Sequence, residues 1–153
     1  MTPQLFDIGK DQCAQLAALH AGSFAEAWSI AALAALLATP GTFAFHLPDG
    51  FVLLRAAGDE AEILSLAVSP PARGRGLGRA LLQAAASHAA SLGVTSLFLE
   101  VGTENPAALA LYAAFGFTKA GRRKAYYASG AGMGTDALIL KAHLPLSPRP
   151  DFA

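Results

Sequence analysis

The feature that most constrains what this chain can fold into is a glycine-rich segment, Arg73-Gly74-Arg75-Gly76-Leu77-Gly78-Arg79. It follows an apolar run and precedes a long stretch with apolar residues at helical spacing. Glycines let the backbone approach an anion without obstruction by a Cβ atom. The N–H groups at the start of a helix point at such an anion, and the helix dipole favours negative charge there. The segment therefore predicts a strand, a phosphate-binding turn and a helix in succession, and with them a phosphorylated ligand.

Spacing separates the kinds of glycine-rich loop that this segment could form. A Walker loop requires Lys-Ser or Lys-Thr after its last glycine, whereas Gly78 is followed by Arg79 and Ala80. The dinucleotide fingerprint requires a third glycine three positions after the second, and that position is Arg79. Two interpretations remain: an Arg-x-x-Gly-x-Gly anion cradle over residues 73–78, and a turn that only begins a helix.

Length and composition indicate one globular domain. The chain has 153 residues, of which 54% are hydrophobic and 14% charged, and neither a repeat nor a linker divides it. We expect a single domain over residues 1–144 and a flexible, proline-containing tail over residues 145–153. Cys13 is the one cysteine, so no internal disulfide forms, and residues 1–10 lack the pattern of an export signal. Both observations favour a cytoplasmic protein.

Several classes of partner are disfavoured. Eleven basic and eleven acidic residues cancel, whereas a nucleic-acid binder normally shows a basic excess. The most membrane-like segment, residues 28–38, is well short of the roughly twenty residues that span a bilayer. The four histidines, at positions 20, 46, 88 and 143, lack ligand spacing, so no metal is expected. We expect a monomer or weak dimer that binds neither nucleic acid nor membrane.

The pattern of apolar residues and breakers predicts an α+β fold. Strands are expected at 5–8, 42–46, 51–55, 62–68, 96–101, 117–127 and 137–140, and helices at 11–21, 29–38, 77–92 and 107–115. Asn105 and Pro106 supply the N-cap and the first residue of the last helix. This order predicts a mixed, mostly antiparallel sheet flanked by helices.

The element order and several blocks resemble the GNAT superfamily of N-acetyltransferases over about residues 4–143. Within it the resemblance is greatest to the RimI-type ribosomal-protein-alanine N-acetyltransferases. The blocks are Leu66 to Pro70, Arg75 to Leu82, Leu99-Glu100-Val101, Asn105 with Ala108 to Tyr112, Gly116-Phe117, and Arg122-Arg123 with Tyr126-Tyr127. The resemblance implies the GNAT fold and direct acetyl transfer from acetyl-CoA to an amine, foremost a protein N-terminal α-amine such as the alanine of ribosomal protein S18.

The resemblance also assigns two catalytic positions. Glu100 matches the general base, which acts directly or through a water, and Tyr112 matches the general acid that protonates the departing CoA thiolate. Alternatives from the residues themselves stay open. Glu104 is a rival base, Glu100 could be an exposed strand residue, and a tyrosine among apolar helix residues is usually packed in a core.

The same resemblance implies the binding residues. Acetyl-CoA is expected to contact Leu66, Ala67 and Val68 along a strand, Arg73, Gly74, Arg75, Gly76, Leu77, Gly78 and Arg79 in the loop, and Asn105. The three arginines could instead be solvated surface charges. Trp28, Tyr126 and Tyr127 match the acceptor-binding side, with ordinary strand packing as the alternative for the two tyrosines.

Two departures from the family pattern concern the acceptor. Such proteins usually carry Phe-Pro-Trp-Ser before the second helix and an Arg just after the Leu-Glu-Val block, whereas this chain has Glu26-Ala27-Trp28-Ser29 and Gly102. Those positions help to shape the acceptor side. The alternatives are therefore an acetyltransferase for small-molecule amines and a CoA-sensing module without turnover.

Overall fold

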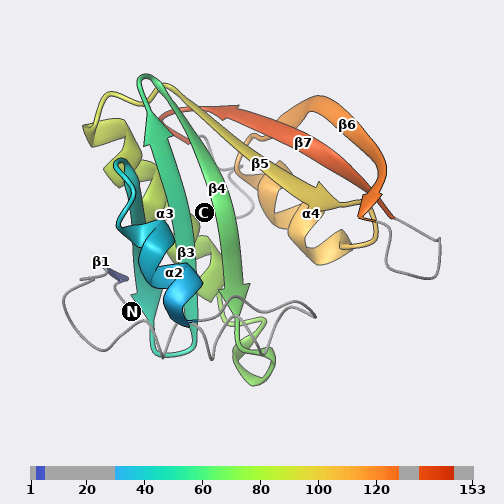
Figure 1. The fold of residues 1–153 in the computed structure, drawn as a ribbon. Coiled ribbons are helices and arrows are strands. Elements are labelled where there is room, and N and C mark those ends of the chain that lie inside the picture. The colour runs from blue at the N-terminus through green and yellow to red at the C-terminus, as the bar shows by residue number, and fades with distance from the viewer. Residues whose placement is uncertain (1–2, 6–29, 128–134, 147–153) are drawn as a thin grey trace.

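The computed structural model describes residues 3–5, 30–127 and 135–146. Their elements are, in chain order, β1 (Gln4–Leu5), α2 (Ile30–Leu37), β2 (Thr42–Leu47), β3 (Gly50–Ala57), β4 (Glu60–Val68), the short 3-10 helix η1 (Pro70–Ala72), α3 (Leu77–Ser91), β5 (Ser96–Gly102), α4 (Pro106–Ala114), β6 (Thr118–Tyr127) and β7 (Thr135–His143). The α+β prediction is confirmed (Figure 1). The helix predicted over residues 11–21 lies outside the described residues.

The described strands form one mixed sheet in the order β1-β2-β3-β4-β5-β7-β6. Every neighbouring pair is antiparallel except β4 and β5, which are parallel. A two-residue turn closes the β2–β3 hairpin, since Leu47 pairs with Gly50. The parallel pair requires a crossover, and α3 provides it on one face of the sheet.

Helices cover both faces of the sheet, with α2 on one side and α3 on the other (Figure 1). On α3 the buried residues follow the predicted helical spacing: Leu77, Leu81, Leu82, Ala85, Ala86 and Ala89. In the main core they join Tyr112 of α4 and Phe115, the residue that follows this helix. Leu92, the last residue of the helix that the sequence predicts, is 54% exposed because the helix ends there and Gly93 turns the chain with a φ of 92°.

β4 contains a bulge, and its pairing with β5 ends at the same place. Leu54 pairs with Ile63 and Leu53 with Ser65, so Leu64 is an extra residue on its strand. Pairing of β4 with β5 begins at Glu60 and Ser96 and ends at Ile63 and Leu99. Beyond that pair the two strands diverge (Figure 1). We call this opening, between residues 64–68 of β4 and residues 100–102 of β5, the fork.

The last described residues return to the core. The Leu144 N–H donates to the Thr95 carbonyl at 2.9 Å, and the side chains of Leu144 and Leu146 pack against the main core. Residues 147–153 lie outside the described part of the chain, so the predicted domain limit stays a prediction. Across the described residues, no helix combines the length and apolar character that crossing a membrane requires.

Candidate active site

A groove of about 670 Å³ opens at the fork. It is lined by Leu66, Ala67 and Val68 of β4, by Ala72, Arg73, Gly74, Gly76, Leu77, Gly78 and Arg79 of the loop and α3, and by Asn105, Ala107, Ala108, Leu111 and Tyr112 at the start of α4. Ten of the eleven residues that we predicted to contact the cofactor therefore line one groove. Arg75 is the exception, since it is exposed and does not line the groove.

The glycine-rich loop has the backbone that its sequence predicts. Gly74 and Gly76 adopt φ values of 81° and 79°, which L-residues with a Cβ rarely adopt. Gly76 is the N-cap of α3, no side chain caps the helix there, and its first turn has no acidic residue. The N–H groups of that first turn, which lack intrahelical partners, therefore begin at the wall of the groove. This end of α3 favours an anion.

Arg73 has a structural contact that the sequence did not reveal. Its Nε donates to the carbonyl of Val68 at 3.0 Å, so the side chain folds back onto the end of β4. This bond ties the loop to the strand before it. Arg73 is exposed but bonded to the backbone of β4, while Arg79 lines the groove at the first turn of α3.

Tyr112 is both a core residue and a groove residue. It is 7% exposed, and its ring meets that of Phe117 edge to face with centroids 5.4 Å apart. Burial raises the pKa of its phenol from 10.0 to about 12. The hydroxyl therefore keeps its proton throughout the neutral range and can act as a hydrogen-bond donor.

Asn105 caps α4 as predicted. Its Oδ1 accepts a hydrogen bond from the Ala108 N–H at 3.1 Å, while the residue also lines the groove. Glu104, the rival base, is exposed and is absent from the groove lining. Glu100 does not line the groove either, so the difference between the two carboxylates is that Glu104 is exposed and Glu100 is partly buried.

Glu100 is the first residue of β5 beyond its last pairing with β4. Because Leu99 and Val101 belong to the main core with Tyr112, strand alternation puts Glu100 on the opposite face of the sheet. Its side chain is 24% exposed, and its Oε1 lies 3.1 Å from the Nε of Arg123. Glu100 and Tyr112 thus stand on opposite faces of the sheet beside the fork, and Glu100 does not line the groove itself.

The described structure does not test the predicted acceptor residues. Tyr126 and Tyr127 lie at the end of β6, where Tyr127 pairs with Thr135, but their side chains fall outside the description. Trp28 is also outside the described residues. All three stay predictions.

Sequence reasoning missed some groove residues. Ala108, Leu111 and Tyr112 share one face of α4 at helical spacing, so Tyr112 could have led to the other two. No pattern in the sequence indicated that Ala72 would line the groove. Arg123 was missed as a partner of Glu100 because the pairing of β6 with β7 is irregular near it.

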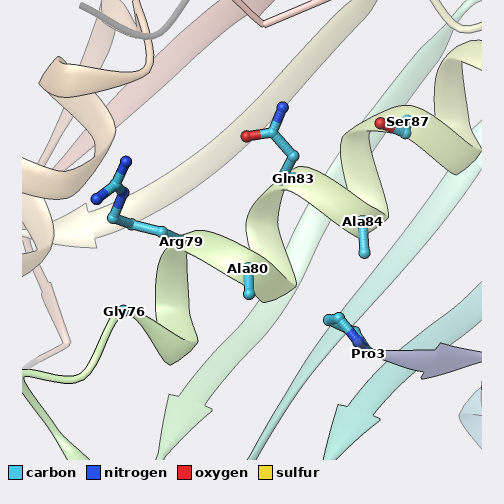
Figure 2. A pocket seen from close by; sticks show the side chains of 7 residues that line it. All are labelled: Pro3, Gly76, Arg79, Ala80, Gln83, Ala84 and Ser87. Atoms are coloured by element: carbon cyan, nitrogen blue, oxygen red, sulfur yellow. The ribbon is translucent and has the colours of Figure 1, made fainter. Parts of the chain in front are cut away.

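A second hollow of about 430 Å³ adjoins the groove and shares Gly76 and Arg79 with it. The other residues that line it are Pro3, Ala80, Gln83, Ala84 and Ser87. Figure 2 shows Ala80 and Ala84 on the side of α3 that faces Pro3, with Arg79 and Gln83 extending from the other side. The hollow thus continues along α3 from the groove.

Among the described residues, no cluster of three or more His, Cys, Asp or Glu side chains could hold a metal ion. The expectation that the protein uses no metal stays a prediction.

Comparison with known proteins identifies the family and several relatives. Residues 14–117 match the Acetyltransferase (GNAT) family. An [ribosomal protein bS18]-alanine N-acetyltransferase of Salmonella typhimurium is 40% identical over 97 residues, which span 63% of this chain and 64% of the relative. The N-alpha-acetyltransferase RimI of Mycobacterium tuberculosis is 38% identical over 131 residues, covering 78% of this chain and 80% of the relative.

A solved structure extends the likeness to almost the whole chain. The ribosomal-protein-S18-alanine N-acetyltransferase of Escherichia coli superposes with a TM-score of 0.81 at 27% identity, over 97% of this chain and 98% of that one. This likeness confirms the predicted fold, a mixed sheet flanked by helices.

Proposed function

Because the chain belongs to the Acetyltransferase (GNAT) family, we propose that it transfers the acetyl group of acetyl-CoA directly to an amine. The observation that carries the proposal is the groove at the fork, which joins a helix N-terminus, two glycines with positive φ and a buried phenol in one cavity. The acceptor that we propose is the N-terminal α-amine of a protein.

The groove suits the extended shape and the charges of acetyl-CoA. The diphosphate would meet the first turn of α3, with Arg79 beside it. The pantetheine amides would pair with the backbone of Leu66 to Val68, where β4 has left its pairing with β5. The nucleotide end would continue into the second hollow through the shared residues Gly76 and Arg79. When bound, acetyl-CoA supplies a thioester that an amine can attack.

Tyr112 would donate a proton or hydrogen bond to the departing sulfur. Since the phenol is buried where it lines the groove, negative charge on sulfur beside it would be costly without a donor. A group that stabilises charge only as it develops lowers the barrier without tightening the binding of the substrate. The raised pKa keeps the donor protonated at any physiological pH.

Glu100 would accept the proton of the attacking amine, directly or through a water. An α-amino group with a pKa near 8 is already about a tenth neutral at pH 7, whereas a lysine is neutral roughly once in 2,500 molecules. A single carboxylate is therefore a better match for an N-terminal amine than for a lysine.

The names of the relatives support a more specific choice of acceptor. Since two of the proteins similar to this chain are named for the alanine of ribosomal protein bS18 or S18, we propose an alanine N-terminus, with bS18 foremost. Such a partner would be met in the cytoplasm. The altered residues Glu26, Ala27 and Gly102 are the reason to test acceptors rather than to assume this one.

The test is acetylation by the purified full chain. Acetyl-CoA is supplied with peptides that begin with alanine, serine or methionine, with the bS18 N-terminal peptide, and separately with polyamines and aminoglycosides. We expect CoA release with the alanine peptides and a fragment mass that puts one acetyl group on the α-amine. Turnover only with small amines would show that the acceptor is a small-molecule amine and not a protein N-terminus. Binding of acetyl-CoA with no turnover would favour a CoA-sensing module.

A further inference from the structure

Glu100 stands at a place in the sheet where one neighbouring strand is missing. It follows the last β4–β5 pair, so β4 no longer flanks it. A glutamate side chain has three rotatable bonds, and fixing it costs conformational entropy. A base that must meet an amine in the fork therefore needs a partner on its other side.

The strand register shows how Arg123 reaches that place. Glu100 pairs with Ile139 on β7, and Gly102 pairs with Ala137, which in turn pairs with Arg123 on β6. Arg123 thus stands two rows from Glu100 along the strands and about two strand spacings, roughly 10 Å, across the sheet. Its guanidinium crosses β7 and ends with Nε 3.1 Å from Oε1 of Glu100.

Small residues leave room for this crossing. Ala137 lies between Arg123 and Gly102 in one row, and Gly121 occupies the β6 position in the row of Glu100. Ala137 has a short side chain, and neither glycine has any. A Cβ built at Gly102 would meet nothing within 4 Å, so the space beside Glu100 is open.

The preceding residue, Arg122, has a different partner. Its Nε and Nη2 lie 2.7 Å and 2.6 Å from Oδ2 of Asp136 at the start of β7. Strand alternation puts Arg122 and Arg123 on opposite faces of β6. Arg122 therefore binds the strands of its own hairpin together, whereas Arg123 reaches past β7 to β5.

On this basis we propose that Arg123 is a positioning residue for Glu100, a role that rests on the proposed function. The ion pair holds the carboxylate at the edge of the fork, where the acceptor amine must give up its proton. Both side chains are partly exposed, at 44% and 24%, so the pair contributes little to the stability of the fold. The role of the ion pair is to orient the Glu100 carboxylate.

The experiment compares Arg123→Gln, Arg123→Lys and the matched control Arg122→Gln in steady-state acetylation of an alanine-starting peptide by the full chain. We expect Arg123→Gln to lower kcat between about tenfold and a hundredfold, the range in which misplacement of a reacting group falls. The KM for acetyl-CoA stays within about twofold, because the groove is untouched. Arg123→Lys recovers part of the loss, and Arg122→Gln leaves kcat within about twofold of the original chain.

A second-site rescue separates positioning from a structural effect. An arginine introduced by Gly102→Arg would lie two residues from Glu100 on the same face and within reach of its carboxylate. In the Arg123→Gln background this change is expected to restore at least part of kcat. Equal kcat for Arg123→Gln and the original chain, or a loss that neither Arg123→Lys nor Gly102→Arg recovers, would overturn the role.

Failure of the proposed function gives a different result. An original chain that binds acetyl-CoA but acetylates no amine contradicts the function, and the role of Arg123 falls with it. An active original chain with an equally active Arg123→Gln variant leaves the function standing and removes only the inference.

Discussion

Ile63 on β4 and Leu99 on β5 form the last pair between these two strands, and the groove opens immediately beyond them. The extra residue Leu64 directly follows Ile63, so the bulge and the end of the parallel pairing coincide. This one irregularity leaves the backbone of Leu66 to Val68 available to a ligand. It also separates β4 from β5 beside Glu100 and Tyr112, which lie on opposite faces of the sheet.

Removal of the Tyr112 hydroxyl tests the proposed acid. Tyr112→Phe is expected to lower kcat at least about tenfold, since the donor acts only as charge develops on sulfur. The affinity for acetyl-CoA, measured by calorimetry, should stay within about threefold because the aromatic ring and its contact with Phe117 are kept. Unchanged turnover would leave Tyr112 with packing as its only role.

The raised pKa of Tyr112 predicts how stability depends on alkaline pH. The folded-state pKa is about 12 and the unfolded value 10.0, so the folded state holds the proton more tightly. This contribution is fully present below pH 10 and is lost as the pH rises from 10 to 12. Two pKa units correspond to about 3 kcal/mol.

Thermal melts of the original chain and of Tyr112→Phe between pH 8 and about 12 measure that contribution. The original chain should lose more Tm over the upper part of this range than the variant does. Tyr126 and Tyr127 are common to both proteins, so the difference isolates Tyr112. Parallel curves would mean that its phenol is not buried in solution.

Agreement between sequence and structure is best where local chemistry decides the backbone. The glycines at 74 and 76, the apolar spacing of α3 and the Asn105-Pro106 pair each act within a few residues, and each predicted its feature correctly. Along β5 the buried residues Leu97, Leu99 and Val101 alternate with partly buried ones that include Glu100, which is the period of a strand.

Features that depend on pairing between strands could not be predicted from the sequence. Residues 62–68 look like one continuous strand, and nothing local marks Leu64 as a bulge or Ile63 as the last residue paired with β5. The ion pair of Arg123 with Glu100 depends on the register of three strands. Such contacts are set by the whole sheet, whose registers depend on turns and bulges far apart in the sequence.

The cap of α4 makes a separate prediction about stability. Asn105→Ala removes the acceptor of the Ala108 N–H and should cost about 1 kcal/mol in the free energy of unfolding. Asn105→Ser, which keeps a capping oxygen, should cost only a few tenths of that amount. Urea denaturation of the two variants checks this order, and equal losses would show that the cap contributes nothing.

The anion site at α3 can be tested by a change that separates binding from stability. Gly78 lies in the first turn of α3 with an ordinary helical backbone, and a Cβ there would come no closer than 3.5 Å to Leu111. Gly78→Asp should hold or raise the Tm, because a carboxylate at a helix N-terminus is favourable by about 0.3–1 kcal/mol. The same carboxylate should weaken acetyl-CoA binding at least about tenfold, since it occupies the place proposed for the diphosphate.

Gly78→Ala is the matched control, with the same Cβ and no charge, and should bind acetyl-CoA within about threefold of the original chain. Calorimetry that finds equal affinity for the Asp and Ala variants would place the diphosphate away from this helix.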